Sequence, residues 1–274
     1  MSANSKSAST RSAITVPRLH EMKSRREKIV VLTAYDASFA ALCDGAGVDV
    51  VLVGDSLGMV VQGHSSTLPV TLDHMVYHCA AVARGVGHAL LVADLPFMSF
   101  STIDAALHAS ARLMAEGGAA MVKLEGADYS LEVIDALARR FVPVCAHLGL
   151  TPQSVHKLGG YRVQGKTKAA AEQLLADAKA VQQAGADLLV LECVPAALAA
   201  RISAELSIPT IGIGAGVDCD GQVLVLYDML GITPGKRPRF SRDFLAAAGS
   251  VAEAIRAYAD DVRAGKFPAP EHAF

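Results

Sequence analysis

The sequence lacks the features that mark several large classes of protein. Its 274 residues include no tryptophan, 5% aromatic residues and 19% charged residues, and the formal net charge is −2. Without a basic run or a positive balance, the chain has no electrostatic footprint for nucleic acid or for an anionic membrane surface. No apolar run approaches the roughly 20 residues that a membrane-spanning helix needs. We therefore expect neither nucleic acid nor a membrane as a partner.

Cysteine is also sparse, and its pattern argues against two kinds of cross-link. The five cysteines are odd in number and form no Cys-x-x-Cys pair, which disfavours both a disulfide framework and a zinc site. Most of them lie in or beside apolar segments. The pattern predicts buried, reduced thiols in a cytoplasmic protein, at Cys43, Cys79, Cys145, Cys193 and Cys219.

Aliphatic residues, by contrast, are abundant. Hydrophobic residues make up 52% of the chain and the mean hydropathy is +0.35, enough for a large core and for further apolar surface buried between subunits. We therefore expect a homo-oligomer. Residues 1–13, rich in Ser and Ala, predict a disordered tail, although Lys6 and Arg11 without an acid also resemble a transit peptide. Residues 14–274 are predicted to form one catalytic domain.

Short apolar runs alternate with helical segments along this domain. The runs predict strands at 29–33, 50–53, 89–94, 119–125, 142–146, 187–192, 210–213 and 223–226. Helices are predicted at 36–46, 71–84, 102–116, 131–140, 168–184, from 195 onward and at 242–263, with little room for one between the last two strands. Eight strands exceed the usual number in a doubly wound sheet, so the pattern favours a single (β/α)8 TIM barrel of the α/β class.

Acidic side chains stand where several of these predicted strands end. Asp55, Asp94, Glu125 and Glu192 each close an apolar run, and His147 follows another. In a (β/α)8 barrel the functional groups gather at the carboxyl ends of the strands. A single acid there is often only a helix cap, but five polar residues on five strands predict an active site.

Lysine at position 123 strengthens this prediction. Lys123 and Glu125 are two residues apart on one strand and therefore point to the same face, where a buried ammonium needs an anion. Carboxylate oxygens with one imidazole suit Mg²⁺ or Mn²⁺ better than zinc. Such a metal polarises a carbonyl and makes the neighbouring C–H acidic, so that a spare carboxylate can act as the base.

Eight motifs resemble the ketopantoate hydroxymethyltransferase family. They are long, follow one another in the family's order, and lie within a likeness that covers roughly residues 14–265, at 32–36, 53–58, 94–97, 123–126, 147–153, 160–166, 192–195 and 211–216. Departures from the family pattern are small. Ala127 and Ala146 stand where glycine is more usual, and Tyr227 stands where histidine is more usual.

The resemblance implies a reaction, a cofactor and an assembly. A hydroxymethyl group passes from 5,10-methylenetetrahydrofolate to 3-methyl-2-oxobutanoate and gives 2-dehydropantoate. The family's barrel uses one Mg²⁺ per subunit and often forms a decamer in the bacterial cytoplasm. By position, the implied metal ligands are Asp55, Asp94 and Glu125, the implied substrate contacts are Asp55, Ser56, Asp94, Lys123 and His147, and the implied proton acceptor is Glu192.

Two other functions remain open from the residues alone. A Mg²⁺-dependent lyase or mutase of the phosphoenolpyruvate mutase and isocitrate lyase type would share the barrel and the acidic site, although the cysteine-bearing loop expected of it is not evident. A barrel that binds a metabolite without catalysis would also accommodate these residues. Replacing Glu192 with Gln would distinguish this non-catalytic barrel from an enzyme, because only an enzyme would lose orders of magnitude in rate.

Overall fold

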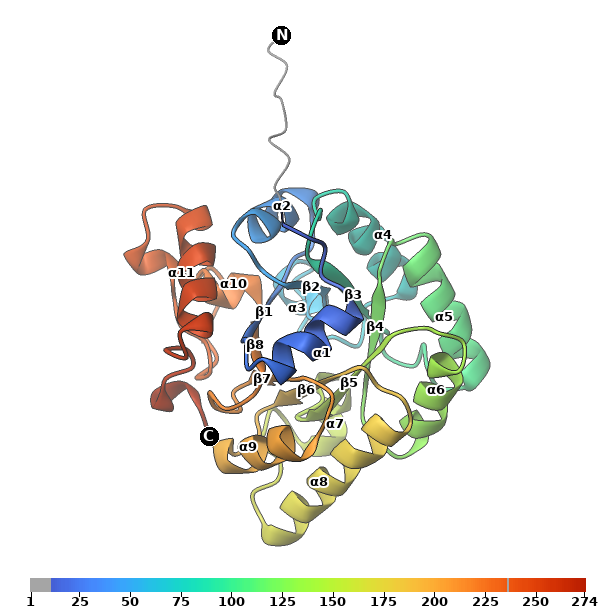
Figure 1. The fold of residues 1–274 in the computed structure, drawn as a ribbon. Coiled ribbons are helices and arrows are strands. Elements are labelled where there is room, and N and C mark those ends of the chain that lie inside the picture. Colours follow the sequence, from blue (N-terminus) through green and yellow to red (C-terminus); the bar gives the residue numbers. More distant parts are fainter. Residues whose placement is uncertain (1–10, 236) are drawn as a thin grey trace.

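Eight parallel strands close into a barrel in the computed structural model, which describes residues 11–235 and 237–274 (Figure 1). Each strand pairs with the next in the sequence, and β8 closes the ring by pairing with β1. The strands are β1 (Ile29–Thr33), β2 (Val50–Val53), β3 (Leu90–Asp94), β4 (Met121–Glu125), β5 (Val144–Gly149), β6 (Leu188–Glu192), β7 (Thr210–Ile213) and β8 (Gly221–Leu224). The predicted single (β/α)8 TIM barrel is confirmed.

Helices surround this barrel, and the side chains at their N-termini explain where several begin. The Asp36 carboxylate accepts from the backbone N–H groups of Ser38 and Phe39, and the Thr102 hydroxyl accepts from that of Ala105. The helices are α1 (Val16–Ser24), α2 (Ala37–Gly45), α3 (Leu57–Val60), α4 (Leu72–Ala83), α5 (Ile103–Ala115), α6 (Tyr129–Ala138), α7 (Val155–Leu158), α8 (Lys168–Gln183), α9 (Ala196–Glu205), α10 (Leu226–Met229) and α11 (Val251–Arg263). Within the described part of the chain, none of them could cross a membrane.

Helix α1 covers one end of the barrel and was not predicted. It lies across the barrel opening in Figure 1. Two of its own side chains, Leu19 and Met22, are buried. The Lys23 ammonium donates to Asp220, just before β8, at 2.7 Å, so this is the end where the strands begin. Thr15 caps the helix and Pro17 occupies its first turn. These two residues are the sequence features that could have predicted its start. Residues 1–10 of the predicted tail lie outside the described residues.

Several element boundaries differ from the prediction. Strand β5 continues through His147 to Gly149, and β8 begins earlier, at Gly221, because Leu226 donates its N–H to the Thr33 hydroxyl and starts α10 instead. Helix α11 begins at Val251 rather than at 242, since the Ser250 side chain caps it there. Between β7 and β8 no helix is present in the described residues, as the short spacing predicted.

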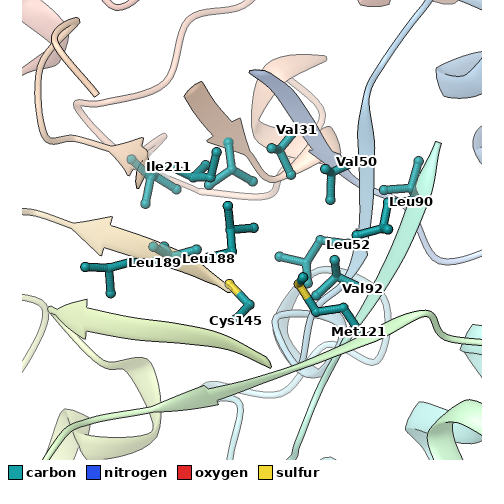
Figure 2. Packing of buried hydrophobic residues seen from close by; sticks show 14 of the residues in the cluster. Val31, Val50, Leu52, Leu90, Val92, Met121, Cys145, Leu188, Leu189 and Ile211 are labelled. Atoms are coloured by element: carbon teal, nitrogen blue, oxygen red, sulfur yellow. The ribbon is translucent and has the colours of Figure 1, made fainter. Parts of the chain in front are cut away.

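The barrel interior positions the site above a layer of apolar side chains. Figure 2 shows such side chains gathered in the space that the strands surround, among them Val50, Leu52, Val92, Met121 and Cys145. Successive side chains on a strand point to opposite faces, so residues two apart share a direction. Asp94, Lys123 and His147 each lie two residues beyond one of these interior side chains. The apolar layer therefore lies directly below a cluster of buried polar side chains at the carboxyl ends of the strands.

Candidate active site

The predicted polar residues lie at neighbouring strand ends and are buried. Asp55, Asp94, Lys123, Glu125 and His147 are all exposed by 5% or less. The sheet register sets Asp94 beside Lys123 and Glu125 beside His147, because β3, β4 and β5 pair in that order. The side chain of Glu192, at the end of β6, is 13% exposed. The cysteines confirm the prediction of free, buried thiols.

Lys123 and Asp94 form a buried ion pair at the centre of this group. The Lys123 ammonium donates to Asp94 Oδ1 at 2.7 Å, and the backbone N–H of Asp55 donates to Asp94 Oδ2 at 3.0 Å. Burial alone lowers the pKa of Lys123, but the charges of Asp94, Glu125 and Asp55 outweigh that effect and raise it above its ordinary value. Lys123 is therefore a permanent cation inside a cluster of acids.

Gln153 joins two of the acids, and the sequence-based analysis assigned it no role. Its side-chain amide donates to Asp55 Oδ2 at 2.8 Å and its backbone N–H donates to Glu125 Oε2 at 3.0 Å. The residue lies in the 147–153 motif, but its side chain is a neutral amide, and neither charge nor metal-ligating chemistry marks it as functional. Its contacts depend on how the loop after β5 folds back over the barrel, which the sequence pattern does not reveal.

The acids repel one another in the absence of a further cation. Burial, reinforced by the charge of Asp94, raises the pKa of Asp55 to about 7, and burial with the charge of Asp55 raises the pKa of Glu125 well above its usual range. These are hard oxygen donors that a divalent cation would stabilise as carboxylates. Among the described residues, no three His, Cys, Asp or Glu side chains are arranged around one point. Mg²⁺ characteristically needs only one or two protein carboxylates, so the donor set fits it.

His147 and Glu192 form a neutral pair at the edge of the acidic group. His147 Nε2 lies 3.2 Å from Glu192 Oε2 and His147 Nδ1 lies 3.7 Å from Glu125 Oε1, yet neither ring nitrogen has a well-directed hydrogen bond among the described residues. Burial, with the charge of Lys123, keeps the pKa of His147 well below its usual value, while burial raises the pKa of Glu192 to about 8. A deeply buried imidazole whose ring nitrogens have no hydrogen bond among the described residues indicates that a ligand completes the site.

Ser56 lies beside an aromatic group that includes Tyr227. The hydroxyls of Tyr35 and Ser56 are 2.9 Å apart, and the Tyr35 and Tyr227 ring centroids are 5.7 Å apart. The ring centroids of Phe39 and Tyr227 are 6.1 Å apart. Tyr227, which stands where the family more usually has histidine, thus packs against Tyr35, and Tyr35 contacts Ser56, the residue after Asp55.

Close packing at Gly149 brings the β5 loop next to Glu192. Gly149 has φ +92°, and a Cβ atom there would lie 2.3 Å from the Glu192 backbone oxygen. The next residue, Leu150, donates its N–H to that same oxygen at 2.8 Å. Only glycine tolerates both this backbone conformation and this approach. The glycine therefore sets how closely His147 and Gln153, on either side of it in the chain, lie to β6.

A separate cavity of about 760 Å³ lies at the other end of the barrel and contains none of the predicted site residues. It is lined mainly by the N-terminal segment, the start of β2 and the end of α11, including Arg11, Arg18, Arg26, Lys28, Asp49 and Arg263. Most of its cations already have partners, as in the contacts of Arg18 with Glu21 and Glu27. The buried acids, rather than this cavity, identify the chemical centre.

Comparison with known sequences indicates one family over almost the whole chain. The family model described as ketopantoate hydroxymethyltransferase matches residues 13–270. The chain is 60% identical over 265 residues to the 3-methyl-2-oxobutanoate hydroxymethyltransferase of Alkalilimnicola ehrlichii, covering 97% of this chain and 96% of the relative. It is 58% identical over 266 residues to the enzyme of that name from Burkholderia mallei strain SAVP1, covering 97% and 98%.

Solved structures with a similar fold include a phosphoenolpyruvate phosphomutase from Streptomyces platensis. That structure matches with a TM-score of 0.59 at 15% identity, covering 79% of this chain and 82% of the other. Identity at this level shows a shared barrel fold and nothing about the reaction. The mutase and lyase alternative therefore retains a likeness in fold, whereas the close sequence relatives are hydroxymethyltransferases.

Proposed function

The chain belongs to the ketopantoate hydroxymethyltransferase family, whose reaction serves pantothenate biosynthesis, and from that premise we propose how its barrel acts. The acceptor is 3-methyl-2-oxobutanoate, the donor is 5,10-methylenetetrahydrofolate and the product is 2-dehydropantoate. One Mg²⁺ per subunit assists. The observation that carries the proposal is the buried cluster that contains the Lys123–Asp94 pair, two further acids and the His147–Glu192 pair.

By family resemblance the metal residues are Asp55, Asp94 and Glu125. Since no three of the described acids surround one point, one or two of them would ligate the metal directly and the others would contribute negative charge beside it. A carboxylate has several lone-pair sites, so Asp55 and Glu125 keep capacity for a cation while each accepts one hydrogen bond from Gln153. When bound there, Mg²⁺ supplies Lewis-acid polarisation of the substrate's 2-oxo group. Asp55, Ser56, Asp94 and Lys123 contact the oxo acid, and His147 lies against it.

In this proposal one side chain accepts a proton from the substrate and another stabilises the negative charge that results. Glu192 accepts the proton from C3 of the oxo acid, which has no other hydrogen next to the carbonyl. The fixed Lys123 ammonium stabilises the negative charge that develops as the proton leaves, and it needs no reorganisation because Asp94 already holds it at 2.7 Å. Water releases the one-carbon unit of the donor as formaldehyde by breaking its two carbon–nitrogen bonds, and tetrahydrofolate leaves. The C3 carbanion equivalent then adds to the formaldehyde carbon, and the proton held by Glu192 passes to the new hydroxyl oxygen.

The first test is exchange of the C3 hydrogen in D₂O. Proton NMR of 3-methyl-2-oxobutanoate with the purified protein should show loss of the C3–H signal with Mg²⁺ and none with EDTA, measured with and without tetrahydrofolate. The reason is that enolisation precedes one-carbon transfer and needs no donor. Absence of exchange from folded, Mg²⁺-bound protein would contradict the proposal. Phosphonopyruvate-type and C–C-cleavage substrates would then test the lyase and mutase alternative.

The rate of this exchange should rise with pH. Glu192 accepts a proton only as the carboxylate, and burial raises its pKa to about 8. Above that pH the base is already ionised and the rate should level off, whereas below it the rate should fall about tenfold per pH unit. Initial exchange rates at subsaturating substrate, corrected for the protein-free rate, measure this profile. A rate that stays flat or rises as the pH drops below 8 would exclude Glu192 as the base.

A homo-oligomer in the cytoplasm, by family resemblance a decamer, completes the proposal. Several large apolar side chains are exposed on the single chain, including Tyr77, Met98, Tyr129 and Phe141. Burial of such residues between subunits would account for the high mean hydropathy of +0.35. Light scattering after size exclusion would measure the subunit number.

A further inference from the structure

We propose that Gln153 is a positioning residue that holds the carboxylates of Asp55 and Glu125 in the arrangement that binds the divalent cation. This inference rests on the proposed function, and it assigns a role to a side chain that is not itself a ligand. Gln153 is 8% exposed and lies in the 3-10 helix η1 (Pro152–Ser154), directly after the loop that leaves β5.

The amide group of Gln153 bridges the ends of two strands. Its Nε2 atom donates to Asp55 Oδ2 at 2.8 Å and to the backbone oxygen of Leu95 at 2.9 Å. An amide NH₂ has two hydrogens, so both are used. Leu95 directly follows β3, and Asp55 lies two residues beyond the end of β2. The Asp55 carboxylate is thus tied to a rigid point of the backbone rather than left to rotate.

The backbone of Gln153 adds a third strand end. Pro152 is the first residue of η1, and the following N–H, which has no partner within so short a helix, donates to Glu125 Oε2 at 3.0 Å. Glu125 is the last residue of β4. One residue on the β5 loop therefore fixes the ends of β2, β3 and β4 relative to its own strand.

The neutrality of the amide suits a positioning role better than a charge-compensating one. A lysine or arginine at this place would hold the same oxygens but would neutralise the acids and repel a cation. Gln153 orients one oxygen of each carboxylate and leaves the negative charge of the group unchanged. Partners that orient metal ligands in this way typically contribute about 10- to 100-fold to metal affinity.

The test is Mn²⁺ binding, measured by electron paramagnetic resonance without substrate. Gln153→Met keeps the length and approximate volume of the side chain and removes its donors, so the dissociation constant for Mn²⁺ should rise about 10- to 100-fold. Gln173→Met is the matched control: the Gln173 amide also donates to an aspartate, Asp177, at 2.8 Å, but on the exposed surface of α8. The affinity of Gln173→Met for Mn²⁺ should equal that of the unmodified protein. In the exchange assay, excess Mg²⁺ should restore much of the rate of Gln153→Met.

Thermal unfolding of each variant separates positioning from folding. If Gln153→Met does not fold, Gln153→Asn decides the matter, because it keeps a polar amide but is one methylene too short to reach both Asp55 and Leu95. Unchanged Mn²⁺ affinity in a folded Gln153 variant, while the unmodified protein binds Mn²⁺ and exchanges C3–H, would overturn this inference alone. Failure of the unmodified protein to bind Mn²⁺ would overturn both this inference and the proposed metal site.

Discussion

Glu192→Gln should lower the rate of C3–H exchange by about 10²- to 10⁴-fold, the range that a general base contributes. Glutamine has the same shape as glutamate and cannot accept the proton. The substitution should be well tolerated by the fold, because burial already raises the pKa of Glu192 to about 8 and the native group is largely protonated at neutral pH. Proton NMR in D₂O with Mg²⁺ measures the effect.

A surface glutamate is the matched control for this substitution. Glu205→Gln on α9 alters a carboxylate that pairs with Lys179 and Arg201 at the periphery. It should leave the exchange rate unchanged. If Glu192→Gln exchanged as fast as the unmodified protein, the base would be another group, and His147, whose Nε2 lies 3.2 Å from Glu192 Oε2, would be tested next.

Lys123→Met should reduce both activity and stability, which makes it the second large effect. Loss of the ammonium removes the fixed positive charge that stabilises the enolate, at a cost of about 10²- to 10³-fold in rate. It also leaves Asp94 as a buried carboxylate beside Asp55 and Glu125 without its cation. Removing one partner of a buried ion pair typically destabilises by about 3–5 kcal/mol. Urea unfolding and the exchange assay measure the two effects separately.

The exposed pair Lys179–Glu205 provides the comparison. Its side chains are 46% and 33% exposed, against 6% for each partner in the Lys123–Asp94 pair. Lys179→Met should therefore change neither the urea midpoint nor the exchange rate appreciably. Added Mg²⁺ should recover part of the stability of Lys123→Met, since a bound cation would compensate the remaining acids. An equal, small loss of stability in both variants would show that the buried pair has no special role.

Parts of the fold were predictable because the signal was local. The strands β1, β2 and β7 have their predicted ends, since each is a short apolar run bounded by residues of another kind. Helix α1 was missed although Thr15 and Pro17 mark its start, because α1 lies outside the strand–helix alternation that organised the prediction. Strand β8 was misplaced by two residues because Leu226 turns toward Thr33, a contact between the two ends of the domain.

The sequence by itself determined the barrel and predicted which side chains are candidates for the chemistry. Continuous apolar runs and acids at strand ends are properties of consecutive residues, and the long motifs carry the family. Only the tertiary structure decided which charged side chains form ion pairs and which polar side chains are hydrogen-bonded. That Lys123 contacts Asp94, that the His147 ring nitrogens have no hydrogen bond among the described residues, and that Gln153 ties Asp55 to Leu95 depend on distances between strands. Such distances follow from barrel closure and loop packing, which no local pattern of residues encodes.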